Sequence, residues 1–149
     1  MLKLSQYAEL EKDIPFINNL LRQLNPEAPV VTKKTLVNIL SDKAYVKIAI
    51  FRDKSKNNQI FGMASLHIIR TFFGLKGIVE NVVVDKEYRG HGFGRQLVVG
   101  LIDAAKKKGV VYLELTSGTE RQSAQKMYEL LGFKKRETNV YRLELKERQ

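Results

Sequence analysis

The feature that most constrains the fold is a glycine-rich turn that joins a strand to an amphipathic helix. Residues 78–85 are rich in Val and Ile, which indicates a central, largely buried strand. Glycine then alternates with other residues at Gly90, Gly92 and Gly94, and apolar residues recur at helical spacing as far as Lys108. Since a further strand follows this helix soon afterwards, the region predicts a strand–helix–strand unit with parallel strands.

The turn has the composition of an anion-binding site. Glycines allow successive backbone N–H groups to point to one side of a tight turn. The helix that follows adds unpaired N–H groups and the positive end of its dipole. Arg89 and Arg95 add positive charge. We therefore predict a pyrophosphate site; a plain strand-to-helix turn is the alternative, but it needs neither three alternating glycines nor two arginines.

The spacing of the glycines excludes two nucleotide-binding motifs. Glycines at 90, 92 and 94 do not fit the G-x-G-x-x-G dinucleotide fingerprint, and they lie late in the chain. The turn also lacks the Gly-Lys-Ser/Thr ending of a nucleotide triphosphate loop. The anion held here is thus expected to belong to a different kind of cosubstrate.

The remaining elements predict an α+β fold, in which one mixed sheet is flanked by helices. We expect a short strand at the N-terminus and a bend over residues 72–77. Thr32, Gly109 and Gly132 are expected to cap helices. No repeat or linker divides the chain, so its 149 residues predict a single domain, 1–149. The expected helices are 12–24, 32–40, 92–108 and 121–131, and the expected strands are 44–52, 59–71, 78–85, 110–116, 133–137 and 139–145.

The composition excludes several kinds of chemistry. The chain has no cysteine, so disulfides, thiolate nucleophiles and cysteine-based zinc sites are ruled out. Only two histidines, His67 and His91, are present, and no metal is expected. The N-terminus lacks the apolar core of a secretory signal, and no apolar run approaches the roughly 20 residues that span a bilayer. A cytoplasmic protein is the expectation.

The chain is basic, with 26 Lys and Arg against 16 Asp and Glu, a net charge of +10. Such a surplus suits a polyanion or a phosphorylated cosubstrate. The cluster at 106–108 ends a predicted helix, where cations meet the negative end of the dipole. No basic helix carries interleaved aromatic residues, so neither a specific nucleic-acid partner nor a membrane partner is expected.

Two segments resemble motifs of the GNAT superfamily of N-acetyltransferases. Residues 82–94 resemble its motif A, written Arg/Gln-x-x-Gly-x-Gly/Ala, with Arg89, Gly92 and Gly94 at the required positions. Residues 124–133 resemble its motif B, in which an Ala, a Tyr and a Gly-Phe pair recur at this spacing. The order of helices and strands is similar over nearly the whole chain, whereas the first 40 residues match in outline only.

The resemblance implies a mixed, largely antiparallel, twisted sheet of six to seven strands. About four helices would flank this sheet, and it would splay between its fourth and fifth strands. Family members are often dimers, so a homodimer is a further expectation.

The resemblance also implies acetyl-coenzyme A (acetyl-CoA) as the cosubstrate. The backbone of Val82, Val83 and Val84 would pair with its pantetheine arm as an added strand, often beside a bulge. Many family members carry an Asn seven residues before the motif B Tyr, where this chain has Arg121, which would contact the cosubstrate instead. The pyrophosphate would be held by the turn residues Arg89, Gly90, His91, Gly92, Phe93, Gly94 and Arg95.

The resemblance places Tyr128 near the sulfur of coenzyme A as the general acid. The alternative is a packing role, because Tyr128 also belongs to an apolar stripe on its helix. With no cysteine, direct attack of the amine is favoured over an acyl-enzyme. A strand N–H near Val82 or Val83 would stabilise the oxyanion.

Two carboxylates are candidates for the base that deprotonates the amine. Glu80 lies in an otherwise apolar strand, where burial is expected to raise its pKa. Glu114 lies on the next parallel strand. Either could act through water, or be a structural carboxylate paired with Arg70 or Lys47.

We expect an N-acetyltransferase that acts on a primary amine, first of all that of a small molecule. An amino group of a protein or peptide is the alternative acceptor. A different class of function also stays open: a basic module that binds nucleic acid or another ligand and keeps a vestigial acetyl-CoA site.

Overall fold

The computed structural model describes residues 3–4, 10–42 and 44–145. Contacts within the chain divide it into two units, Met1–Thr116 and Ser117–Gln149. Among the described residues, three helices lie with the sheet in the first unit, and one helix lies in the second. No helix among the described residues combines the length and apolarity that crossing a bilayer requires.

The first unit is built on a mixed sheet whose strands follow the chain order. Each of the first three pairings is antiparallel, and only the last is parallel. The predicted mixed, largely antiparallel sheet is therefore confirmed, but the described residues form five strands rather than six to seven. These strands are β1 (Lys3–Leu4), β2 (Val46–Asp53), β3 (Gln59–Thr71), β4 (Gly74–Val84) and β5 (Tyr112–Glu114).

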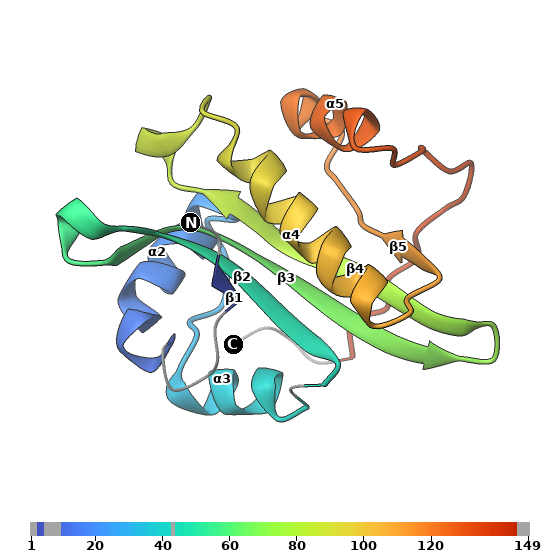
Figure 1. The fold of residues 1–149 in the computed structure, drawn as a ribbon, viewed down its shortest axis with the longest axis horizontal. Coiled ribbons are helices and arrows are strands. Elements are labelled where there is room, and N and C mark those ends of the chain that lie inside the picture. Colours follow the sequence, from blue (N-terminus) through green and yellow to red (C-terminus); the bar gives the residue numbers. More distant parts are fainter. Residues whose placement is uncertain (1–2, 5–9, 43, 146–149) are drawn as a thin grey trace. The chain divides into compact units, whose positions relative to one another are not determined.

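Three helices of this unit cover the two faces of the sheet, and a fourth belongs to the second unit. Figure 1 shows α2 and α3 on one face and α4 on the other. Short 3-10 turns lie at Glu11–Asp13, Lys54–Lys56 and Lys86–Tyr88. The helices are α2 (Ile14–Leu24), α3 (Lys33–Leu40), α4 (Phe93–Lys107) and α5 (Gln122–Leu130).

Each face of the sheet has its own hydrophobic core, because side chains alternate along the strands. On the α4 face, Leu97 and Leu101 pack fully buried against Leu66 of β3. On the other face, Leu20 of α2 packs with Ile50 of β2. Burying one such side chain contributes roughly 1.5–3 kcal/mol, so the two cores fix the helices to the sheet.

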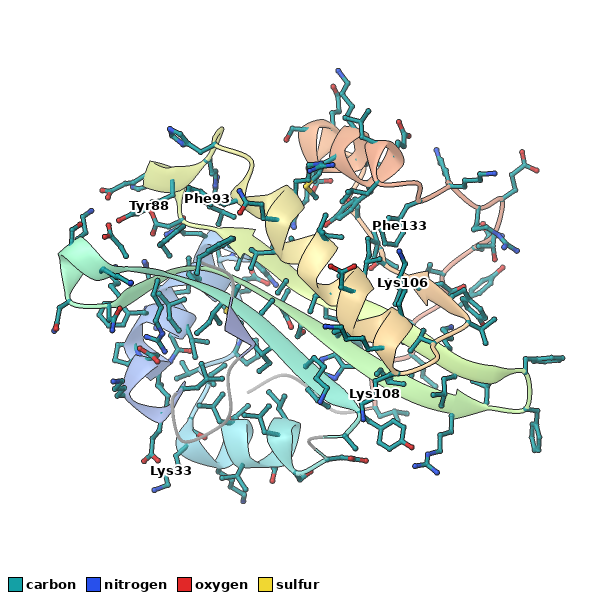
Figure 2. All side chains as sticks on the ribbon, in the orientation of Figure 1. Lys33, Tyr88, Phe93, Lys106, Lys108 and Phe133 are labelled. Carbon is teal, nitrogen blue, oxygen red and sulfur yellow. The ribbon has the colours of Figure 1, made fainter. Side chains whose placement is uncertain are left out.

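The predicted caps are confirmed. Thr32 begins α3 through a capping box with Thr35, each side chain accepting from the other's backbone N–H. Gly109 follows α4 with φ +72°. Figure 2 shows Lys106 and Lys108 at this end of α4, where the helix dipole is negative.

The bend predicted over residues 72–77 is shorter in the structure, because only Phe72 and Phe73 form the turn and β4 already begins at Gly74. Gly77 lies inside the strand, and a Cβ there would be 2.3 Å from Leu113 and 2.9 Å from Leu66. This glycine serves close packing rather than a turn. The sequence alone does not distinguish these two uses of glycine.

The predicted strands 133–137 and 139–145 are also wrong. The described residues after α5 form no strand, and Val140, Tyr141 and Leu143 are largely exposed. Alternating apolar residues form a strand only where another strand pairs with their backbone N–H and C=O groups. Among the described residues, no strand pairs with this segment. The strand predicted at 110–116 is shorter, Tyr112–Glu114.

An ion pair at the start of α2 supports a prediction about stability. Asp13, with its side chain 4% exposed, accepts from Arg52 at 2.9 and 2.5 Å. We expect Asp13→Ala to lower the free energy of unfolding by about 3–5 kcal/mol, because it leaves a guanidinium mostly buried without its carboxylate. Chemical denaturation measures this loss.

The matched control is Lys33→Ala, which removes the exposed Lys33–Glu11 pair of the same region. Lys33 is labelled in Figure 2. Its cost is expected to stay below about 1 kcal/mol. Equal losses in the two variants would contradict the assignment of the Asp13–Arg52 pair as the structural one.

Candidate acetyl-CoA site

The candidate site begins where β4 and β5 separate. Their ladder joins Lys76–Ile78 to Tyr112–Glu114 and covers only these three pairs among the described residues. Beyond Ile78, β4 continues to Val84 along β3 alone. The edge of β4 that faced β5 is thus available to an added strand.

A β-bulge lies in this free part of β4. The register passes from Met63↔Val83 to Ser65↔Glu80, so β4 carries one more residue than β3. Asn81 within the bulge has φ +55°, in the left-handed region. Non-glycine residues adopt this conformation at a cost, so the fold maintains it against strain.

The turn between β4 and α4 leaves its backbone accessible to an anion. Gly90 and Gly92 have φ +81° and +77°, and a Cβ at either would meet no atom within 4 Å. Their open side leaves the backbone accessible. The first bond of α4 runs from Gln96 N–H to the Gly92 carbonyl, so the N–H groups of the preceding helical residues have no acceptor within the helix. No acidic side chain lies in the first turn.

The charged residues of the turn lie on its surface. Arg95 is exposed, whereas the Arg89 Nε atom donates to the Val84 carbonyl at 2.9 Å. His91 is exposed, and its Nδ1 lies 2.9 Å from the Arg89 carbonyl. The turn and both arginines therefore combine accessible backbone N–H groups with positive charge, as a pyrophosphate site requires.

An aromatic cluster holds both ends of this turn, and sequence reasoning missed it. Tyr88 stacks on Phe61 at 4.2 Å between ring centroids, and Phe93 meets Phe61 edge-on at 5.0 Å. Phe51 also contacts Phe93. Tyr88 and Phe93 are labelled in Figure 2. The only signal in the sequence was that one aromatic residue precedes the glycines and another lies between Gly92 and Gly94.

Polar contacts from distant segments complete the support of the turn. Gln23 of α2 donates to Asp85 at 2.8 Å and accepts from the Lys86 N–H at 3.0 Å. The Tyr88 hydroxyl donates to Asp53 at 2.5 Å. Hydrogen bonds from Ser55 and Tyr88 lower the pKa of Asp53 from 3.8 to about 2.

Tyr88→Phe is expected to raise the pKa of Asp53 toward its ordinary value, because the ring stays and only the donor is lost. In the wild type the folded-state pKa lies below the unfolded one. The stability that Asp53 contributes is therefore complete above about pH 4 and is lost as the pH falls through about 2. Carboxyl NMR titration measures the pKa. Tyr112→Phe is the control. An unchanged Asp53 pKa in Tyr88→Phe would show that the hydrogen bond from the Tyr88 hydroxyl does not lower this pKa.

The side chains of the predicted strand contact belong to the cores. Val83 is buried toward α2 and α3, and Val82 and Val84 pack on the α4 face. Any contact of these residues with a cosubstrate would therefore use the backbone.

The structure places both candidate bases on one face of the sheet, opposite α4. Glu114 pairs with Lys76, not with Arg70 or Lys47. The expected burial of Glu80 is wrong, because its side chain is exposed. Glu80 is therefore not a buried carboxylate of the kind expected for the base.

Tyr128 and Arg121 belong to the second unit. Tyr128 is half-buried on α5, and its ring meets Phe133 edge-on at 5.9 Å. Burial raises the pKa of Tyr128, and Arg121 partly opposes this effect. Arg121 precedes α5, is exposed and lies 3.4 Å from Glu120. Across the described residues, no group of three His, Asp or Glu side chains is arranged to hold a metal.

Comparison with known proteins identifies relatives of the chain. Residues 16–133 match the model of the acetyltransferase (GNAT) family. A glucosamine 6-phosphate N-acetyltransferase of Trypanosoma brucei brucei is 33% identical over 124 residues, which are 80% of this chain and 81% of the relative.

A solved structure supports the same fold. The crystal structure of a Trypanosoma brucei acetyltransferase superposes with a TM-score of 0.78 at 31% identity, covering 97% of this chain and 99% of the other. A shorter match is to the ribosomal protein bS18-alanine N-acetyltransferase of Escherichia coli. The two sequences are 42% identical over 53 residues, which are 36% of this chain and 36% of the relative.

Proposed function

Since the chain belongs to the acetyltransferase (GNAT) family, we propose that it is an acetyl-CoA-dependent N-acetyltransferase acting on a primary amine of a small molecule. The observation that carries this proposal is the open glycine turn before α4, beside a β4 edge that β5 leaves free. We propose further that both units form one acetyltransferase domain. A homodimer is the proposed assembly, which the mass in solution tests.

The turn residues Arg89–Arg95 would bind the pyrophosphate of acetyl-CoA through backbone N–H groups and the two arginines. The backbone of Val82–Val84 would bind the pantetheine arm. Arg121 would contact a phosphate or the adenine side. Acetyl-CoA supplies the acetyl group as a thioester, and every other contribution comes from the chain.

Tyr128 is the proposed proton donor to the departing sulfur. Its raised pKa keeps the hydroxyl protonated at neutral pH, as a donor requires. Glu80 and Glu114 are the proposed carboxylates on the side of the amine. Glu114 is already engaged by Lys76, so Glu80 is the freer of the two to meet a cation. With no cysteine in the chain, the amine attacks directly.

The acceptor class is proposed from the relatives' names. A relative that matches 80% of this chain is named for a phosphorylated amino sugar, and this name supports a small polar amine as the acceptor. The relative named for an alanine of a ribosomal protein matches only 36% of the chain, so a protein or peptide amine ranks second.

The experiment is a screen of acetyl-CoA consumption across four amine classes: amino sugars with and without phosphate, aminoalkyl compounds, amino acids and N-terminal peptides. We expect saturable thiol release with one small-molecule class and an acetylated product of the matching mass. Thiol release with peptides alone would favour a protein or peptide amine as the acceptor. Nucleic-acid binding without any acetyl-CoA affinity would overturn both.

A further inference from the structure

A polar cluster surrounds the β4 bulge on the sheet face opposite α4. It consists of Ser65 and His67 of β3 with Glu80 and Asn81 of β4, here called the bulge cluster. Ser65 is only 4% exposed, and Asp13 is the one other buried polar or charged residue among the described part of the chain. Asp13 forms an ion pair with Arg52. The Ser65 hydroxyl contacts both Asn81, which has the strained backbone, and the ring of His67.

The hydrogen bonds of the bulge cluster determine where its protons lie. The Ser65 hydroxyl lies 3.2 Å from the Glu80 carbonyl and 3.3 Å from Asn81 Oδ1, and both of these oxygens can only accept. Ser65 therefore uses its proton on the bulge. With the Ser65 proton directed to the bulge, we assign His67 Nε2, at 3.2 Å from Ser65 Oγ, as the donor to that oxygen. A neutral His67 thus carries its proton on Nε2 and leaves Nδ1 as a proton acceptor.

The residues around His67 allow its ring to be neutral at rest and to accept a proton. Its cross-strand partners, Val46 and Ile78, are apolar. On the same face of β4, Glu80 and Lys76 lie on either side of Ile78, and Lys76 is paired with Glu114 of β5. Burial lowers the pKa of His67, and the charge of Glu80 opposes this effect.

The position of the bulge cluster relates it to the proposed acetyl site. Glu80 and Asn81 come directly before Val82, where the proposed contact with the pantetheine arm begins. They also lie beyond Ile78, at which the β4–β5 ladder ends. Strained, non-glycine residues such as Asn81 concentrate at functional sites, where the surrounding contacts maintain them.

We propose that His67 accepts the proton of the acceptor ammonium, with Glu80 stabilising the imidazolium and Ser65 positioning the ring. This inference rests on the proposed function and assigns the base that the carboxylates alone leave open. Glu80 is then a charge partner of the base rather than the base itself.

The proton balance is complete without a further reactant. The ammonium gives one proton to His67 Nδ1, and the freed lone pair forms the N–C bond to the acetyl carbonyl carbon. The C–S bond breaks with its electron pair on sulfur. The nitrogen then loses its one surplus proton, and the sulfur gains a proton by way of Tyr128. His67 finally releases its proton to water, so one proton is produced for each acetyl group transferred.

The first test is a histidine NMR titration, which needs no turnover. His67 and His91 are the only histidines, and His91→Gln identifies the signals. We expect His67 to titrate below 6.5, with its neutral form protonated on Nε2. Glu80→Gln should lower this pKa further, and Ser65→Ala should give a mixture of tautomers. An Nδ1-protonated His67, or a pKa that Glu80→Gln leaves unchanged, would overturn the proposal.

The second test is the pH dependence of kcat with both substrates saturating. The wild type is expected to lose activity at acidic pH, as His67 becomes protonated in the complex with its substrates. His67→Gln should lower kcat about 100-fold and remove this acidic limb. Glu80→Gln, an exposed change that preserves the fold, should shift the limb to lower pH. Ser41→Ala, at the end of α3, is the control and should change neither.

The two hypotheses fail differently. If the wild type transfers acetyl groups and His67→Gln keeps its kcat and acidic limb, the role of His67 is overturned and the proposed function stands. If the wild type neither binds nor consumes acetyl-CoA, the proposed function falls, and the role of His67 falls with it.

Discussion

Gly92→Val is expected to abolish acetyl-CoA binding while the protein remains folded. Gly92 has φ +77° and a Cβ position with no atom within 4 Å, so the new side chain would project into the space proposed for the pyrophosphate. Each charge-assisted hydrogen bond contributes about 1.5–3 kcal/mol, so losing two of them weakens binding roughly 100-fold or more. Isothermal titration with acetyl-CoA measures this change.

Gly109→Val is the matched control for this prediction. Gly109 lies at the other end of α4 with φ +72°, and its Cβ position is equally open. Both variants therefore carry a similar backbone strain of about 1–2 kcal/mol. We expect both to lose similar stability and only Gly92→Val to lose acetyl-CoA affinity. Unchanged affinity in Gly92→Val would remove the argument that the turn holds the pyrophosphate.

Tyr128→Phe is expected to lower kcat about 100-fold and leave acetyl-CoA affinity nearly unchanged. The ring and its edge-on contact with Phe133 remain, so the change removes only the hydroxyl proton donor. Because burial raises the Tyr128 pKa above 10, the loss should hold throughout neutral pH. Steady-state kinetics at saturating acetyl-CoA measure kcat.

Tyr141→Phe is the control, because Tyr141 is 88% exposed and its substitution removes the same hydroxyl elsewhere in the second unit. It should keep wild-type kcat. If Tyr128→Phe also keeps wild-type kcat, Tyr128 is a packing residue of α5 and the proton reaches the sulfur by another route.

The features that were predictable from the sequence are those set by local chemistry. Alternating glycines predicted a tight turn before α4, and in it Gly90 and Gly92 have positive φ. Thr32 and Gly109 cap helices as their residue types indicate. Each of these depends on the backbone preference of one residue and on neighbours within one turn, so tertiary contacts do not overrule it.

The errors arose where distant parts of the chain decide the outcome. Glu80 lies in an apolar run, but its burial depends on which distant segments pack against that part of β4, and its side chain is exposed. The supports of the turn also come from far along the chain: Gln23 and Asp85 are 62 residues apart, and Asp53 and Tyr88 are 35 apart. No local pattern encodes such pairings.

The most direct test of the central claim is a backbone amide NMR titration of the wild type with coenzyme A. If the turn before α4 holds the pyrophosphate, the amide signals of Gly90–Arg95 should shift with a common saturating dependence on ligand, and those of Val82–Val84 should follow the same curve. A ligand that leaves these amides unmoved, while signals elsewhere shift, would contradict the account.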